Sequence, residues 1–183
     1  MKTKSLPLFL LTTFLMLIAA CSKDRVSPKN QDDSFMPMHI GNYWGTSNRE
    51  ISYTEIQDTL RIDNKLYYKF FSLVGGDAFG VSYLRIDEQN RLIEAYPKYP
   101  NRIYVRADFD AKVGDVFYTL GDQTVNDYKV KVASKTDTEM SFDFEMVYHS
   151  TLKGQIHTNK YIKGRGWSGN FEKVILNGIT YGK

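Results

Sequence analysis

Apolar and polar residues alternate with a period of two along most of the chain after residue 35, which predicts β-strands. The clearest case is 140–148, where methionine and aromatic side chains hold the even positions and Ser141, Asp143 and Glu145 lie between them. The segment 66–74 is apolar on both of its faces instead. That pattern is typical of a central strand with a neighbour on either side.

Short turns separate these segments and set the boundaries of the predicted strands. Charged or glycine-containing turns occur at 63–65, 75–77 and 88–90. Asn177 followed by Gly178 is a signal for the type I′ turn of a two-residue hairpin. The strands predicted in this way are 56–62, 66–74, 81–87, 91–96, 102–108, 128–132, 140–148, 171–176 and 179–181.

The fold class that follows is all-β. No window keeps the 3.6-residue period of an amphipathic helix, and about ten short strands joined by short turns predict an antiparallel meander. So many strands curl or split to limit their exposed edges. We therefore expect a curved sheet or a barrel-like meander, with a β-sandwich as the alternative, since short turns favour pairing between sequential neighbours.

One local pattern occurs twice: an apolar residue, glycine, Asn or Asp, any residue, and a large aromatic. The residues concerned are Gly41, Asn42 and Trp44 in the first copy and Gly114, Asp115 and Phe117 in the second. Glycine permits a tight turn and the polar residue caps it, so each copy predicts a corner that starts a strand. Its aromatic residue then packs inward. A ligand-contacting loop is the alternative interpretation.

The N-terminus has the organisation of a secretory signal. Lys2 and Lys4 precede the uncharged segment 6–20, which is too short for a membrane span of about 20 residues. The residues before Cys21 resemble the bacterial lipobox. The resemblance implies cleavage between Ala20 and Cys21 and attachment of lipid to Cys21; an ordinary secreted form and a retained anchor helix are the alternatives.

The expected organisation is a lipoprotein signal peptide at 1–20, a flexible tether at 21–34 and one β domain at 35–183. The tether is polar and charged, so it cannot bury enough apolar surface to order itself. A lipid on Cys21 would place the protein in the cell envelope, at the outer membrane. The charges after Cys21 do not decide between the periplasmic and the surface face.

Four segments of the chain are similar in order and spacing to a group of lipoproteins and secreted proteins of Gram-negative bacteria that use type IX secretion. The segments are 36–44, 83–87, 108–115 and 161–166, which correspond to that group's Pro-x-x-x-Gly-Asn-x-Trp, Leu-Arg-x-Asp, Asp-Phe-x-x-x-x-Gly-Asp and late Gly-x-Gly patterns. The resemblance implies a β-rich envelope domain and a lipid anchor in place of a C-terminal sorting domain. It supplies no activity.

Charge and cysteine content exclude several classes of function. Removal of residues 1–20 leaves 22 basic and 21 acidic residues, a balance that argues against a nucleic-acid partner. Cys21 is the one cysteine, so its acylation would leave no thiol for disulfides, catalysis or metal binding. The three histidines lack the spacing of a zinc site, and 108–115 lacks the closing glutamate of a calcium loop. We expect no metal and no cofactor.

The aromatic residues are the most informative surplus. They crowd the strand 66–74 and surround two prolines near 96–100. Tyr67, Phe71, Tyr96 and Tyr99 are the candidate ligand-facing side chains, although most aromatics belong to the core. We expect a non-enzymatic, membrane-anchored module that binds a small molecule, a glycan or a peptide. The alternatives are a structural subunit of an envelope protein complex and a hydrolase.

Overall fold

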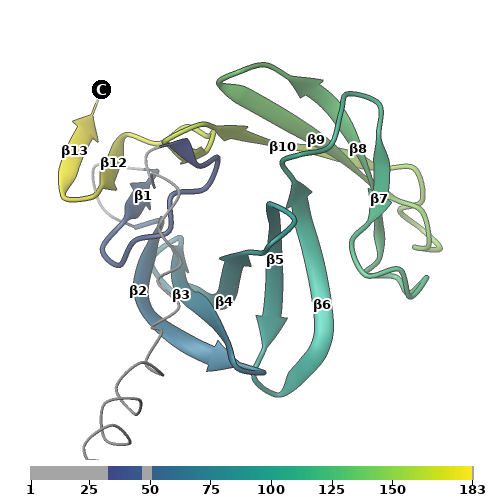
Figure 1. Cartoon of the computed structure of the whole chain (residues 1–183), viewed down its shortest axis with the longest axis horizontal. Coiled ribbons are helices and arrows are strands. Elements are labelled where there is room, and N and C mark those ends of the chain that lie inside the picture. Colours follow the sequence, from purple (N-terminus) through teal and green to yellow (C-terminus); the bar gives the residue numbers. More distant parts are fainter. Residues whose placement is uncertain (1–32, 47–50, 183) are drawn as a thin grey trace, which may run out of the picture.

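The structure is a computed structural model that describes residues 33–46 and 51–182. Its elements of regular structure are all β-strands (Figure 1). The strands are β1 (Tyr43–Gly45), β2 (Tyr53–Ile62), β3 (Lys65–Val74), β4 (Ala78–Ile86), β5 (Arg91–Tyr96), β6 (Tyr99–Asp108), β7 (Val116–Tyr118), β8 (Tyr128–Lys135), β9 (Glu139–Met146), β10 (Ile156–Ile162), β11 (Gly166–Trp167), β12 (Lys173–Leu176) and β13 (Ile179–Gly182).

These strands form two antiparallel sheets. The first has eight strands in the order β13-β12-β1-β2-β3-β4-β5-β6, and the second has five in the order β11-β10-β9-β8-β7. Apart from the pairing of β12 with β1, every neighbour in a sheet is also a neighbour in the chain. The predicted antiparallel meander is therefore confirmed.

The eight-stranded sheet is strongly curved. Figure 1 shows β1 to β6 following an open arc, with β7 to β10 beyond one side of it. The described strands do not close into a barrel, since each sheet keeps two edge strands. The prediction of a curved sheet is confirmed. The second sheet packs on the first, as the two sheets of a β-sandwich do, so the fold also has a feature of the predicted alternative.

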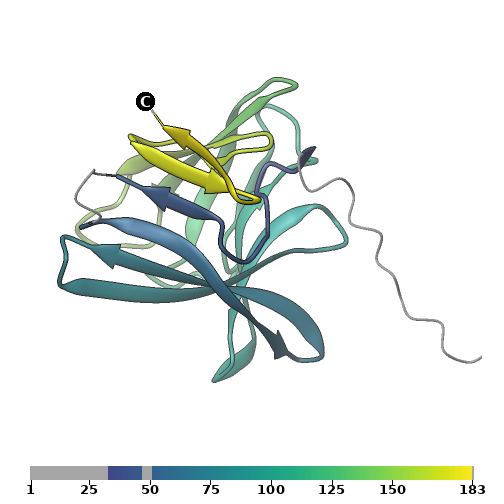
Figure 2. The same ribbon diagram turned by 90° about the vertical axis from the view of Figure 1, so that its left-hand side faces the viewer.

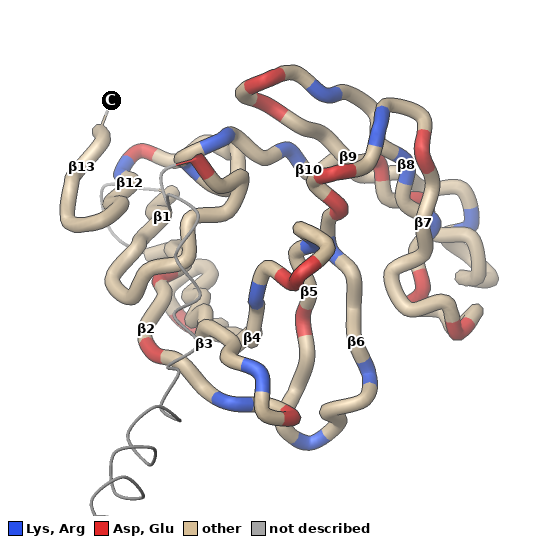
Figure 3. The backbone as a smooth tube through the Cα atoms, viewed as in Figure 1, with Lys and Arg blue, Asp and Glu red and all other residues tan. Residues whose placement is uncertain are grey.

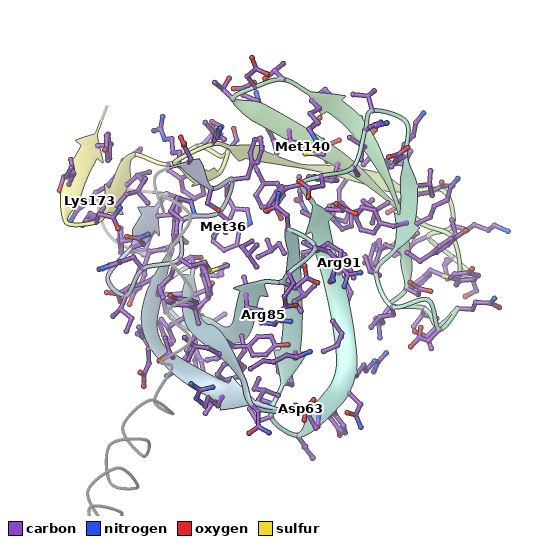
Figure 4. All side chains as sticks on the ribbon, in the orientation of Figure 1. Met36, Asp63, Arg85, Arg91, Met140 and Lys173 are labelled. Carbon is purple, nitrogen blue, oxygen red and sulfur yellow. The ribbon has the colours of Figure 1, made fainter. Side chains whose placement is uncertain are left out.

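An apolar core joins the two sheets, and we call it the inter-sheet core. Its fully buried side chains include Trp44, Ile56, Phe70, Leu84 and Leu92 from the first sheet and Val130, Val132, Met140, Phe142 and Tyr161 from the second. Met36, which precedes β1, is also fully buried in this core (Met36 and Met140 are labelled in Figure 4). Burying one such side chain contributes about 1.5–3 kcal/mol, so this core holds the sheets together.

The two glycine corners adopt the same hydrogen-bonded arrangement. The Gly41 N–H donates to the Ile56 carbonyl at 2.8 Å, and the Ile56 N–H donates to the backbone carbonyl of Asn42 at 2.9 Å. The Gly114 N–H donates to Val132 at 2.9 Å in the same way. The backbone φ angles are +89° at Gly41 and +92° at Gly114, a region that L-residues with a side chain rarely adopt.

The similarity extends beyond the corners. In β2 the register shifts immediately after Ile56, and in β8 it shifts immediately after Val132, so each strand has a bulge next to its corner. Ile56 pairs with Phe70 and Val132 pairs with Phe142. Both sheets therefore contain the same unit, which consists of a corner, a strand with a bulge and a partner strand.

The C-terminal hairpin completes the first sheet. Asn177 and Gly178 both have positive φ, at 51° and 79°, as the predicted type I′ turn requires. In Figure 2 the hairpin of β12 and β13 lies alongside β1. The side-chain oxygen of the buried Asn42 accepts a hydrogen bond from the Asn177 N–H at 2.9 Å, which fixes the hairpin to the first corner.

Candidate functional site

The eight-stranded sheet has a second apolar cluster on the face that points away from the inter-sheet core. Successive residues of a strand point to opposite faces, so Tyr68 packs against the inter-sheet core while Tyr67 points the other way. Leu92 and Ile93 divide in the same manner. We call this second group the back-face cluster; it contains Ile62, Tyr67, Ile93 and Ala95, with Tyr83, Ile103 and Val105 packed against them.

A cavity of about 640 Å³ opens over this cluster, and we call it the back-face cavity. Its apolar floor consists of Ile62, Tyr67, Ile93, Ile103 and Val105. Charged residues from the β2–β3 and β4–β5 turns form its rim, namely Asp63, Lys65, Arg85, Asp87, Glu88 and Arg91. In Figure 4, Arg85 and Arg91 lie near β4 and β5, while Asp63 lies at the β2–β3 turn.

A second cavity of about 750 Å³ adjoins the first. The two share Pro100, Asn101, Ile103 and Leu120 in their walls, so they are direct neighbours. This adjoining cavity adds Lys98, Tyr99, Arg102 and Asp122. An ion pair of 3.2 Å between Arg102 and Asp122 connects β6 to the loop after β7.

The segment Tyr118–Gly121, which begins at the last residue of β7, forms one wall of the back-face cavity. The Val105 N–H donates to the Thr119 carbonyl at 2.8 Å, which attaches the wall to β6. The buried Asp127 carboxylate accepts hydrogen bonds from the N–H groups of Leu120 at 2.9 Å and Gln123 at 3.0 Å. Charge-assisted hydrogen bonds of this kind are strong, so they fix the backbone of the wall in position.

The β4–β5 turn is organised by Asp87, whose side chain is 2 % exposed. Its carboxylate accepts bonds from the backbone N–H of Gln89 at 3.0 Å and of Arg91 at 2.9 Å. It also accepts a bond from Nε of Arg91 at 2.8 Å. A residue with φ of 57°, Asn90, allows the sharp return into β5. Asp87 therefore holds Arg91 in place at the rim.

Arg85 lies beside this turn with its side chain only 10 % exposed. The guanidinium stands over the ring of Tyr67, 5.6 Å from its centroid, and contacts the Glu88 carboxylate at 3.2 and 3.4 Å. Its buried Nε has no hydrogen-bond partner among the described residues. Burial lowers the pKa of Arg85, but the hydrogen bonds to Glu88 and Tyr67 outweigh it and raise the pKa above its ordinary value.

The structure brings together two of the four predicted ligand-facing aromatics. Tyr67 lies in the floor of the back-face cavity, and Tyr99 lines the adjoining cavity with 58 % of its surface exposed. Tyr96 lines neither cavity; its hydroxyl donates to the buried Glu94. Phe71 lies elsewhere on the back face, in a row of rings described next.

That row, which we call the aromatic ladder, crosses β1 to β4 through Tyr43, Tyr53, Phe71 and Phe79. Adjacent ring centroids lie 5.2, 6.0 and 6.1 Å apart. The first and last pairs are stacked and the middle pair, Tyr53 and Phe71, is tilted by 45°. The last ring, Phe79, is 74 % exposed. Phe71 therefore belongs to a surface feature and not to the wall of either cavity.

The sequence interpretation missed the cations of the rim and the wall after β7. Arg85 falls in the Leu-Arg-x-Asp segment that carries the family resemblance, yet that segment alone assigned it no role. Strand alternation was the available signal, because Arg85 shares a face with Tyr83 between the core residues Leu84 and Ile86. The wall at 118–121 carries no comparable signal, since it depends on the distant Asp127.

The predicted lipidation site at Cys21 and the cleavage position after Ala20 lie outside the described residues. Within 33–46 and 51–182, no helix has the length and apolar character that crossing a membrane requires. In the same ranges, His, Asp and Glu side chains form no group of three that could hold a metal ion. Basic and acidic residues are interspersed along both sheets (Figure 3).

No protein-family model matches the chain, and no curated protein or solved structure shows a significant match to it.

Proposed function

We propose that the protein is a membrane-anchored binding module of the cell envelope whose ligand occupies the back-face cavity. A lipid on Cys21 would attach it to the outer membrane, and the β domain would hold the ligand next to that membrane. Its ligand is a small molecule, a glycan or a peptide.

The observation that carries this proposal is the back-face cavity itself. Its volume of about 640 Å³ lies within the range of pockets that hold small ligands, roughly 300–1,000 Å³. An apolar floor with a few charged groups at the rim is the composition typical of such pockets. The inter-sheet core already joins the sheets, so the back-face cluster is a second apolar surface beyond it.

The rim also supports binding in preference to catalysis. A general acid near neutral pH needs a carboxyl pKa raised toward 6–7. The pKa of Glu88 moves in the opposite direction, because hydrogen bonds from Arg85 and its own backbone lower it. Asp87 is engaged by its own turn and by Arg91. We therefore assign neither carboxylate to acid–base catalysis, and we assign Asp87 to organising the rim.

A second candidate function is an interaction subunit of an envelope complex, and the aromatic ladder favours it. The ladder ends at Phe79, a large apolar side chain that is 74 % exposed. Apolar surface of this kind is typical of contact sites. Replacement of Phe79 by serine separates the candidates, since it should disturb assembly and leave the cavity unchanged.

The proposed function is tested by mapping a bound probe on the full chain in lipid nanodiscs. The probe is 4-phenylbutyramide, which is neutral and amphipathic. Methyl resonances of Ile93, Ile103 and Val105 should shift on titration, whereas those of Val81 on β4 and Val130 in the inter-sheet core should not. Shifts confined to ladder residues, or no shifts in the cavity, would contradict the proposal; empty nanodiscs are the control.

A further inference from the structure

We propose that the back-face cavity recognises the carboxylate of an amphipathic ligand through Arg85, and that Glu88 occupies the carboxylate position while the cavity is empty. This inference rests on the proposed function and names the chemical class of its ligand.

The adjacent acids Asp87 and Glu88 differ sharply in their environments. Asp87 has a 2 % exposed side chain and holds Arg91 at 2.7–2.8 Å while accepting two backbone N–H groups. Glu88 has a 71 % exposed side chain and contacts Arg85 only at 3.2 and 3.4 Å. Charge-assisted bonds are usually about 2.7–2.9 Å long. Glu88 is therefore a loosely held partner that solvent or a ligand can replace.

Arg85 has more donors than acceptors in the described part of the chain. A guanidinium carries five N–H donors; Glu88 takes up two of them, and the hydrogen bond to Tyr67 takes up a third. The buried Nε–H meets no acceptor among the described residues, and leaving such a group unsatisfied costs about 1–3 kcal/mol. A better-placed carboxylate would satisfy this arginine more fully than Glu88 does.

The surroundings of Arg85 define the rest of the ligand. The Tyr67 ring lies beneath the guanidinium, and Ile93 and Ile103 continue the floor. An apolar body next to the carboxylate would cover these side chains and displace water from them. The adjoining cavity extends the floor toward Tyr99 and Lys98, which leaves room for a longer chain.

The charge at the rim agrees with an anionic head group. Its three cations, Lys65, Arg85 and Arg91, are matched in number by three carboxylates. If Glu88 turns into solvent, the cations of the rim exceed its remaining carboxylates by one. A ligand carboxylate then restores the balance, whereas a cationic or neutral head group does not.

The test compares phenylalkanoic acids with their amides on the full chain in lipid nanodiscs, by calorimetric titration. The acid 4-phenylbutyrate should bind about tenfold more tightly than 4-phenylbutyramide, because a hydrogen bond to a charged group is worth more than a neutral one. The preference for the acid should decrease as salt is added, because salt screens charges that are exposed to solvent at the rim.

Glu88→Gln removes the internal competitor. It should tighten binding of 4-phenylbutyrate by roughly two- to fivefold, which is the range of an exposed ion pair, and leave the amide unchanged. Glu145→Gln is the matched control, because Glu145 pairs with Lys129 at a similar 3.3 Å on the other sheet. Arg85→Gln should abolish the preference for the acid, and its fold is checked by thermal melting.

Two sources of the carboxylate are distinguished by a second pair of probes. A short peptide ending in phenylalanine is titrated with a free and with an amidated C-terminus. A preference for the free C-terminus alone assigns a peptide terminus, and a preference for phenylbutyrate alone assigns a free organic acid.

Failure of this inference can be told apart from failure of the proposed function. Equal affinities for acid and amide, with Glu88→Gln without effect, would overturn carboxylate recognition while the cavity remains a binding site. If neither probe shifts the cavity methyls, the proposed function falls as well. If 4-phenylbutyrate also binds more tightly to Glu145→Gln, the gain in affinity comes from the lost negative charge and not from the position of Glu88. That result would also overturn the inference.

Discussion

Trp44 and Phe117 hold equivalent positions in the two corners but differ in their environments. Trp44 is fully buried, and its indole N–H donates to the Arg165 carbonyl at 2.8 Å. Its ring packs against Phe70 at 6.3 Å and Trp167 at 5.3 Å. Phe117 is half-buried at the edge of the inter-sheet core, so a shared sequence pattern leads to the same backbone and to unequal burial.

Trp44→Ala should destabilise the fold by about 3–5 kcal/mol, as large-to-small changes in a core do. Phe117→Ala should cost clearly less, because part of its ring already contacts water. Denaturant unfolding of the two variants measures both values. A Trp44→Ala variant that unfolds at the same denaturant concentration as the parent protein would show that the first corner is not structural.

Tyr161 is buried close to the ion pair of Arg106 and Glu94. The sequence patterns did not predict this ion pair. Burial raises the pKa of the Tyr161 hydroxyl to about 12, although Arg106 acts to lower it. Arg106 in turn pairs with Glu94, which is 3 % exposed. Alternation predicted that Glu94 lies on a strand, but its burial depends on the second sheet, which covers it.

The raised pKa of Tyr161 makes the fold sensitive to alkali. The unfolded chain loses this proton near pH 10 and the folded chain near pH 12, so stability is complete below pH 10 and falls as the pH rises toward 12. The loss attributable to this one group is about 2–3 kcal/mol. Unfolding free energies from pH 9 to 12 should fall less steeply in Tyr161→Phe, and the exposed Tyr99→Phe is the control. Equal slopes in all three proteins would contradict the assignment.

At the scale of elements, the repeated corner unit organises both sheets. Each copy supplies a first short strand, a bulged second strand and a third strand whose phenylalanine pairs with the residue at the bulge. The glycine has a positive φ in both copies. A left-handed conformation costs a residue with a side chain about 1–2 kcal/mol.

Gly114→Ala should therefore destabilise the fold by about 1–2 kcal/mol, even though a Cβ there would meet no atom within 4 Å. Gly80→Ala is the matched control, because its Cβ also has open space and its φ is not positive. Thermal melts compare the two changes. Identical melting temperatures for both variants would show that the corner does not depend on glycine.

Period-two patterns predicted the strands that bury one face, including β3, which has apolar clusters on both sides as expected of a central strand. They missed β10 because its side chains are mostly exposed and polar, so no apolar alternation marks it. Its position depends on pairing with β9. The pairing of β12 with β1 was also missed, since no local pattern encodes contact between the two ends of the chain.

At the scale of the whole molecule, the proposed anchor and the proposed cavity lie in different parts of the chain. The anchor depends on a short segment around Cys21 that can be interpreted from sequence alone. The cavity depends on the curvature of the sheet, on Asp127 in a distant loop and on the turns at 63–65 and 87–91, which both line it. Tyr67 was predictable as an aromatic on a strand, but the cavity above it was not.

Cys21→Ser should abolish lipid attachment and release the protein from the membrane fraction. Incorporation of labelled fatty acid and membrane fractionation measure the two effects. Ser22→Ala is the control, because it alters the neighbouring residue and keeps the cysteine. A Cys21→Ser protein that still carries acyl label, sediments with membranes and loses residues 1–20 would refute the anchor.

The central claim, that the back-face cavity binds a ligand, is tested most directly by filling it. Val105→Phe places a ring in the cavity, while Val81→Phe makes the same change on the same sheet outside it. Calorimetric titration of 4-phenylbutyrate should show at least a tenfold loss of affinity in Val105→Phe, because the new ring occupies the space that the ligand needs. The melting temperatures of both variants should stay near that of the parent protein. Unchanged affinity in a folded Val105→Phe, or an equal loss in Val81→Phe, would contradict the claim.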